Sequence, residues 1–301
     1  MKVLVTGASG FLGAKTVSYL LSKGHQVIGL DYKKTIEKKN KYEHYTCDLK
    51  DYKKIEKIFK KYNKFDCVIH TAAIQPLKSE HNFDKYLENN FYGTKNLIEA
   101  SRIFGSRGFI FCSSFSVYQN ENGPINESGK LNPRNSYGLS KKLSENILEY
   151  YSNKFKINTI ILRFDGIFGH NQNLPGFIEM CMGQVMAGEK VLLFNNGKLK
   201  RDYLYIDDAV KSIYLSLDKI KKSRFEILNI GGGKSTKAID IFKKIKIICN
   251  TESKAIFSTK KNVNITKNVF MNIKKAKRKI NYKPETLEIN LKKMHNDYKK
   301  K

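Results

Sequence analysis

The segment VLVTGASGFLG, residues 3–13, constrains the fold of this chain more than any other. It joins an apolar, β-branched run to three glycines in the pattern G-x-x-G-x-x-G, and a helix-forming stretch follows. A chain that leaves a strand, turns tightly and enters a helix favours residues without Cβ, and the helix N-terminus then faces an anion such as a pyrophosphate. The segment predicts a strand–turn–helix unit that binds a dinucleotide. We expect Gly7, Gly10, Phe11, Leu12 and Gly13 to contact the dinucleotide.

Apolar runs alternate with helical patterns along the first half of the chain. This alternation is typical of βαβ units, which build a parallel sheet with helices on both faces. The sequence therefore predicts an α/β protein with a doubly wound parallel sheet of the Rossmann type. The expected strands are 3–6, 27–30, 67–70, 109–112, 160–163, 191–194 and 225–230. The expected helices are 11–23, 50–62, 81–104, 136–152, 175–187, 207–217 and 235–249.

An acidic residue, Asp31, ends the second predicted strand. A carboxylate at this place accepts both hydroxyl groups of an adenosine ribose and repels a 2′-phosphate, so it favours NAD over NADP. Lys33 and Lys34 follow at once and keep NADP open as the less favoured cofactor.

Polar or small residues also stand at other strand ends, where open α/β sheets bind their ligands. Taken singly, each is more often a cap or a turn residue, but their common place at one edge favours a ligand site. The residues expected at the cofactor from this edge are Asp48, Leu49, Ala72, Ala73, Asn90 and Ser113.

A tyrosine and a lysine stand one helical turn apart in NSYGLSKKLSE, residues 135–145. The spacing places Tyr137 and Lys141 on one helix face. A free phenol has a pKa of about 10, and a neighbouring ammonium favours the phenolate, which then takes or gives a proton. Considered alone, the pair fits an ordinary helix surface as well as an acid/base site.

The composition and charge of the chain limit which other functions we expect. The 301 residues carry a formal net charge of +28, but the excess is nearly all lysine, scattered and not interleaved with aromatic residues, so we expect no nucleic-acid partner. The five cysteines are odd in number and lack a C-x-x-C pair, and six histidines show no ligand spacing. No apolar run reaches the length of a membrane span, and the first residues lack the layout of a signal peptide. The sequence predicts a cytoplasmic protein without a bound metal or a membrane span.

Several motifs occur in an order that resembles a known family. They are TGASGFLG, CDL, HTAA, NFYGTKNL, SSFSVY, PRNSYGLSK, GKLKRDYLYIDD and LNIGGG, and they extend from Met1 to about Pro284. In this order they resemble the extended short-chain dehydrogenase/reductases, and among them the NAD-dependent nucleotide-sugar epimerases and dehydratases. The resemblance implies a nucleotide-sugar substrate and a homodimer formed through the helices at about 81–104 and 136–152.

The resemblance also implies roles for single residues. Tyr137 is the acid/base, and Lys141 binds the nicotinamide ribose and lowers the pKa of the phenol. Ser114 hydrogen-bonds the reacting oxygen, and Asn90 belongs to the supporting network. Removing a hydride from a sugar carbinol requires a base, a donor for the developing oxyanion and an aligned nicotinamide, which agrees with these roles. The residues expected to contact the substrate are Ser114, Tyr137, Gly166 and Arg201.

Several positions depart from the family's pattern. Phe115 and Ser116 stand where dehydratases carry an Asp-Glu pair, and epimerase/reductases that resemble the fucose-pathway enzyme carry a cysteine at about Ser116, so both chemistries are disfavoured. Gly166 replaces an asparagine that touches the substrate.

The preferred interpretation is an NAD-dependent nucleotide-sugar 4-epimerase that acts through a transient 4-keto sugar. One alternative is an NAD(P)H-dependent nucleotide-4-keto-sugar reductase, and another is a non-catalytic dinucleotide-sensing or RNA-binding relative. We expect residues 1–165 plus 207–230 to form the NAD-binding Rossmann domain. Residues 166–206 plus 231–301 are expected to form a smaller, discontinuous α/β substrate domain whose lysine-rich tail frays.

Overall fold

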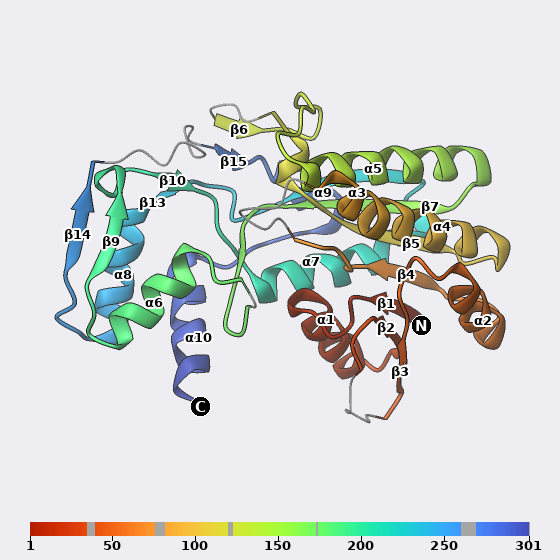
Figure 1. Cartoon of the computed structure of the whole chain (residues 1–301), viewed down its shortest axis with the longest axis horizontal. Helices are drawn as coiled ribbons and strands as arrows, with labels where there is room; N and C mark the ends of the chain where they lie inside the picture. Colours follow the sequence, from red (N-terminus) through yellow and green to blue (C-terminus); the bar gives the residue numbers. More distant parts are fainter. Residues whose placement is uncertain (35–39, 76–81, 120–122, 173, 260–268, 301) are drawn as a thin grey trace.

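A computed structural model describes residues 1–34, 40–75, 82–119, 123–172, 174–259 and 269–300. Figure 1 shows a central sheet covered by helices on both faces, with a smaller lobe of helices and short strands beside it. Within the described residues, no helix is long and apolar enough to cross a membrane.

The central sheet has seven strands in the order β12-β7-β5-β4-β1-β2-β3, and every neighbouring pair is parallel. The predicted doubly wound α/β fold is therefore confirmed. The strand order reverses between β1 and β4, the place where ligands bind at the carboxyl edge of such sheets. The strands are β1 (Lys2–Thr6), β2 (Gln26–Asp31), β3 (Tyr42–Thr46), β4 (Cys67–His70), β5 (Gly108–Ser114), β7 (Asn158–Phe164) and β12 (Phe225–Ile230).

Alternating side chains divide the sheet's core into two clusters. Val3 and Val5 of β1 pack on one face, while Leu4 between them packs on the other, as the period of two in a strand requires. The first face is covered by α1 (Phe11–Ser22), α7 (Ile206–Lys219) and α9 (Lys274–Ile280). The second is covered by α2 (Tyr52–Tyr62), α4 (Gly93–Ile103) and α5 (Ser136–Phe155).

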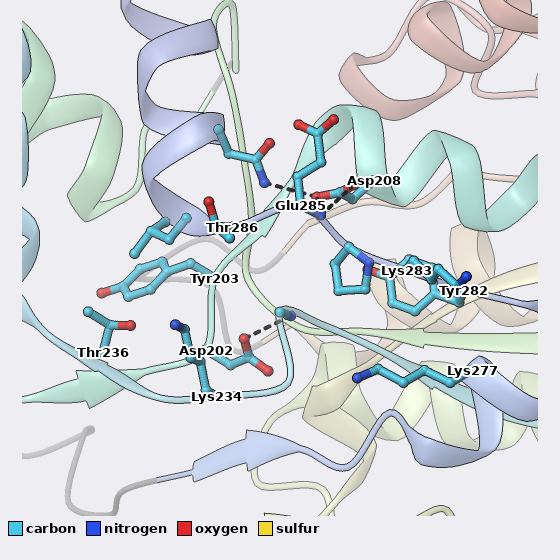
Figure 2. A pocket seen from close by; sticks show the side chains of 14 residues that line it. Asp202, Tyr203, Asp208, Lys234, Thr236, Lys277, Tyr282, Lys283, Glu285 and Thr286 are labelled. Atoms are coloured by element: carbon cyan, nitrogen blue, oxygen red, sulfur yellow. Dashed lines mark hydrogen bonds between the residues drawn. The ribbon is translucent and has the colours of Figure 1, made fainter.

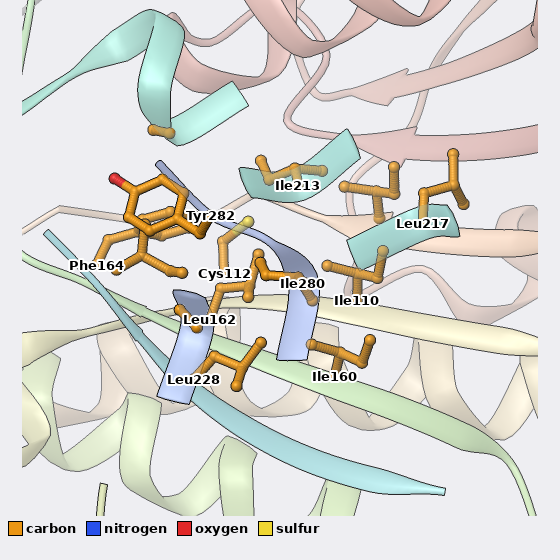
Figure 3. Close-up of a cluster of buried hydrophobic side chains, with 14 of the residues drawn as sticks. Ile110, Cys112, Ile160, Leu162, Phe164, Ile213, Leu217, Leu228, Ile280 and Tyr282 are labelled. Carbon is orange, nitrogen blue, oxygen red and sulfur yellow. The ribbon is translucent and has the colours of Figure 1, made fainter. Parts of the chain in front are cut away.

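Figure 3 shows how the first face is closed at the β12 edge. Ile110, Ile160 and Leu228 from three adjacent strands face Ile213 of α7 and Ile280 of α9, and all five are buried. Helix α9 thus packs on the sheet, although its sequence lies in the range expected for the substrate domain.

The smaller lobe has a core of its own around Ile178, Met182, Ile241 and Ile245. Its elements are α6 (Phe177–Met186), β9 (Val191–Phe194), α8 (Ala238–Cys249), β14 (Ala255–Ser258) and α10 (Leu287–Lys299). The expectation of a frayed tail is wrong, because α10 buries Leu291 and Met294 in this core.

Short strand pairs also form outside the central sheet. Two are parallel and one is antiparallel. They are β6 (Gly123–Ile125) with β15 (Val269–Met271), β8 (Ile167–Phe168) with β11 (Leu204–Tyr205), and β10 (Lys200–Arg201) with β13 (Thr236–Lys237).

Candidate active site

The turn between β1 and α1 leaves no room for side chains. Gly7 has a positive φ of 67°, and a Cβ there would lie 2.8 Å from the Cα atom of Ala72. A Cβ on Gly13 would lie 1.9 Å from the Gly7 carbonyl oxygen. The N-terminus of α1 therefore opens directly onto the edge where β1 and β4 part, beside Phe11 and Leu12, which are half-buried. A backbone cradle at a helix N-terminus fits the pyrophosphate of a dinucleotide.

Asp31 lies beside this turn with its carboxylate already oriented. The backbone N–H of Ser9 donates to Oδ2 and that of Lys33 donates to Oδ1, each at 2.9 Å. The side chain is held at the end of β2, and its remaining lone pairs fit the hydroxyl groups of a ribose.

The other predicted cofactor residues occupy the same edge. Asp48 is exposed after β3, and its Oδ1 accepts a hydrogen bond from the Lys50 N–H at 2.9 Å. Leu49 is half-buried next to it, and Ala72 and Ala73 follow β4, where Ala72 closes on the glycine turn.

Asn90 is buried in a π-helical turn, η1 (Leu87–Tyr92), that leads from α3 (Phe83–Tyr86) into α4. Its Oδ1 accepts from the Ile74 N–H at 2.8 Å, and its Nδ2 donates to the Ser140 hydroxyl at 3.0 Å. One amide thus connects the loop after β4 to α5. The predicted single helix at 81–104 is interrupted at this point, and π-helical turns are frequent at functional sites.

Helix α5 brings the predicted acid/base pair to the end of β5. The Asn135 side chain caps the helix by accepting from the Gly138 N–H at 2.7 Å. Lys141, one turn past Tyr137, is buried, and its Nζ donates to the Cys112 carbonyl at 2.7 Å. This nitrogen lies 5.9 Å from the centre of the Tyr137 ring.

Burial controls the ionisation of both groups. It raises the pKa of Tyr137 to about 12, against a hydrogen bond from Ser114 that favours the phenolate. It lowers the pKa of Lys141 to about 8. The direction for Tyr137 is opposite to the one that the family resemblance implies, because loss of hydration is the largest influence on the phenol. The three side chains expected to do chemistry, Ser114, Tyr137 and Lys141, are nevertheless brought together.

Ser113 points elsewhere. Its hydroxyl donates to the Glu145 carboxylate at 2.5 Å in a buried network. The side chain is therefore engaged within the protein, although the residue lies at the predicted edge.

Gly166 and Arg201 lie near two carboxyl groups that the sequence analysis did not single out. A Cβ on Gly166 would meet only the Asp202 carbonyl oxygen, at 3.7 Å, so the space beside it is open. Burial, together with the nearby Asp202, raises the pKa of Asp165 to about 8, while Arg201 and the Gly166 N–H act in the opposite direction. Asp165 follows β7 directly, and an acid at a strand end, as with Asp31, is the signal that would have found it.

Asp202 connects three segments around this region. Its carboxylate accepts from the N–H groups of Gly232, Gly233 and Met271 at 2.9, 3.1 and 3.3 Å. It also lines a cavity of about 440 Å³ together with Lys234 and Lys277, shown in Figure 2. The lining of this cavity includes none of the predicted site residues.

The comparisons with known proteins agree with the fold. Residues 3–231 match the NAD dependent epimerase/dehydratase family. A putative UDP-glucose 4-epimerase of Methanocaldococcus jannaschii is 31% identical over 292 residues, which cover 94% of this chain and 93% of that protein. A UDP-glucuronate 4-epimerase of Thermodesulfobacterium geofontis is 28% identical over 94% of this chain and 91% of that protein.

Solved structures show the same relationship. A UDP-glucose 4-epimerase from Thermotoga maritima, with UDP-glucose, is 26% identical at a TM-score of 0.87. A UDP-glucuronic acid 4-epimerase from Bacillus cereus, in complex with UDP-glucuronic acid and NAD, is 26% identical at a TM-score of 0.88. Both alignments cover 100% of this chain and 99% of the other. The chain belongs to the NAD dependent epimerase/dehydratase family, and it is an NAD-dependent enzyme of the sugar-nucleotide class.

Proposed function

We propose that the protein is a nucleotide-sugar 4-epimerase that works through a transient 4-keto sugar. The observation that carries the proposal is the convergence of Ser114, Tyr137 and Lys141 from β5 and α5 at the carboxyl edge of the sheet. Similar proteins that are named as 4-epimerases of UDP-sugars support the same chemistry.

In this proposal Tyr137 takes the proton of the C4 hydroxyl and later returns it. Ser114 donates a hydrogen bond to the same oxygen as charge develops, and Lys141 binds the nicotinamide ribose. NAD supplies the hydride acceptor when bound. The residues that would hold it are the cradle of Gly7, Gly10, Phe11, Leu12 and Gly13 and the further cofactor residues Asp31, Asp48, Leu49, Ala72, Ala73 and Asn90, whereas the Ser113 side chain is engaged with Glu145.

The substrate part of the proposal rests on the smaller lobe. We assign Arg201 to the diphosphate of the substrate, and we assign the open space at Gly166 to the sugar or its phosphates. UDP-hexoses are the first substrates to test, because the similar enzymes are named for UDP-glucose and UDP-glucuronate. Phe115 and Ser116 offer no acid–base pair for removing the C6 hydroxyl, so we expect no loss of water.

The test separates the epimerase from the reductase. UDP-glucose and UDP-glucuronate are incubated with the protein and NAD, and the products are resolved by chromatography. An epimer of unchanged mass, without net absorbance change at 340 nm, supports the proposal. Stoichiometric consumption of NADH or NADPH by a 4-keto sugar would instead establish the reductase, and NAD binding without any turnover would favour a non-catalytic sensor.

We also propose a cytoplasmic homodimer with the domain division given above, except that α9 (Lys274–Ile280) belongs with the central sheet. Exposed apolar side chains on α4 and α5, including Ile103, Leu139, Tyr150 and Phe155, support pairing through these helices. Five free cysteines fit a reducing compartment. Light scattering that gives the mass of a single chain would contradict the dimer.

A further inference from the structure

A buried ion pair lies next to the proposed catalytic groups but takes no part in the proton transfer. Glu145 of α5 and Arg163 of β7 have side chains that are 4% and 2% exposed. Arg163 Nη2 lies 2.6 Å from Glu145 Oε2, and Nε lies 3.0 Å from Oε1. Apolar residues of similar size often replace such pairs without loss of stability, so stability alone does not account for the arrangement.

The carboxylate of Glu145 also accepts a hydrogen bond from a second residue, Ser113. The Ser113 hydroxyl donates to its Oε1 at 2.5 Å, and Ser113 directly precedes Ser114 in β5. One carboxylate therefore joins α5, β5 and β7, and it does so one residue before Ser114 on β5.

The helix face that carries Glu145 is the face that carries the chemistry. Glu145 follows Lys141 by four residues and Tyr137 by eight, one and two turns of helix. A displacement of Glu145 relative to β5 would therefore move the two proposed catalytic side chains with it.

Arg163 is fixed from the other side. Its Nη1 donates to the Tyr118 hydroxyl at 2.7 Å and to the Glu127 carbonyl at 3.0 Å. Tyr118 in turn donates to Asn229 Oδ1 of β12 at 2.7 Å. The guanidinium is thus an anchor whose position does not depend on Glu145 alone.

We propose that Glu145 is a positioning residue: anchored by Arg163, it holds α5 against the end of β5 and so sets the separation of the Tyr137 and Ser114 hydroxyl groups. The inference rests on the proposed function and adds a residue that acts through the proposed catalytic groups without touching the substrate.

The charge of Glu145 gives the proposal a second readout. The titratable groups described around Lys141 are Glu145 and Tyr137 on its own helix, Cys112 on β5 and His70 on β4. Burial raises the pKa of Cys112 to about 12 and holds that of His70 well below its usual range, so both stay neutral near pH 7. The influences that oppose the lowering of the Lys141 pKa by burial are Cys112 first and Glu145 second, and the second is the one that a substitution of Glu145 removes.

The first test compares two variants, each of which removes one hydroxyl group that is hydrogen-bonded with the ion pair. Ser113→Ala removes the contact beside the reaction edge, and Tyr118→Phe, the matched control, removes the contact behind Arg163. We expect Ser113→Ala to lower kcat about tenfold without raising the substrate KM, because the catalytic groups lose alignment. Tyr118→Phe should keep kcat within about twofold of the wild type, because the Glu127 carbonyl and the Glu145 carboxylate still hold the Arg163 guanidinium. This should hold even where thermal unfolding shows that the variant is destabilised.

The second test uses Glu145→Gln and needs no sugar turnover. The Kd of NAD is measured by calorimetry between pH 6 and 10 in the variant and the wild type. Removal of the carboxylate charge should make Lys141 lose its proton earlier, so the loss of NAD affinity moves down by about one pH unit. This readout still decides the proposal if the wild type turns over none of the sugars tested, which would contradict the proposed function alone.

Two outcomes would overturn the proposal. One is equal kcat values for Ser113→Ala and Tyr118→Phe, and the other is an unchanged pH midpoint of NAD binding in a folded Glu145→Gln protein. If Glu145→Gln does not fold, because Arg163 is left with a buried charge, the first comparison decides.

Discussion

The ammonium of Lys141 donates to the carbonyl oxygen of Cys112, 2.7 Å away, and not to the phenol of Tyr137 on the same helix. The backbone of β5 thus fixes the lysine before any ligand is considered. The phenol stays protonated because burial raises its pKa. Ionisation of Tyr137 therefore depends on what binds beside it.

Tyr137→Phe should separate binding from chemistry. The ring still packs, but the group that transfers the proton is gone, so we expect kcat to fall by at least about 10²-fold. NAD affinity, measured by calorimetry, should change by less than about fivefold because the lysine and the glycine turn remain. Retained turnover would show that another group is the acid/base.

Lys141 should make the free energy of unfolding of the wild type change with pH in the alkaline range. Burial lowers its pKa from 10.5 to about 8, so between these values the unfolded chain binds a proton that the folded chain does not. The free energy of unfolding should therefore rise with pH across this window, by about 3 kcal/mol in total from this group. Denaturation in urea at pH 7.5 and 10 tests this against Lys141→Met, which lacks the titrating group. Parallel pH curves for the two proteins would contradict it.

Asp165 should make substrate binding weaken at alkaline pH. Its pKa is raised to about 8, so at pH 7 the carboxyl group is largely neutral and does not repel a diphosphate bound at Arg201. Above about pH 8 it ionises, and the KM for the nucleotide sugar should rise. In Asp165→Asn the KM should stay level across this range, whereas Asp218→Asn, an exposed control, should follow the wild type. A KM that rises equally in Asp165→Asn would assign the effect to another group.

Gly13 should tolerate no side chain, in contrast to a glycine elsewhere in a helix. A Cβ on Gly13 would lie 1.9 Å from the Gly7 carbonyl oxygen, whereas a Cβ on Gly183 of α6 would meet nothing within 4 Å. Gly13→Ala should lower both the melting temperature and the NAD affinity, the latter by more than about tenfold, because the turn must open. Gly183→Ala should stabilise the protein by up to about 1 kcal/mol. Normal NAD binding by Gly13→Ala would show that the glycine turn is not part of the cofactor site.

Most of the fold could be predicted from the apolar and glycine patterns of the sequence. The strands at 67–70, 191–194 and 225–230 lie at the predicted residues, because short runs rich in apolar residues mark strands. The first and third belong to the central sheet, and the second lies in the smaller lobe. Helices α9 and α10 escaped prediction because lysines conceal their narrow apolar stripes, such as Leu291 and Met294.

The site was less accessible to sequence reasoning than the fold. Tyr137 and Lys141 are close in sequence, so their common face follows from helix geometry alone. The partners of Glu145 and Asp202 come from segments far apart in the chain, such as Arg163 and Met271, and only the folded arrangement reveals them. The direction of the Tyr137 pKa likewise depends on burial, which the helix pattern does not determine.

The three hydrophobic cores are completed at different positions along the chain, and this allows them to form in order during synthesis. The buried residues on the α2, α4 and α5 face of the sheet end at Ile161, those on the opposite face at Tyr282, and those of the smaller lobe at Met294. Because a chain emerges from the ribosome N-terminus first, the helix that carries Tyr137 can dock before residues 162–300 have been made. The lobe that carries α6 and α8 has to wait for α10, so its apolar surfaces remain exposed until that helix has emerged.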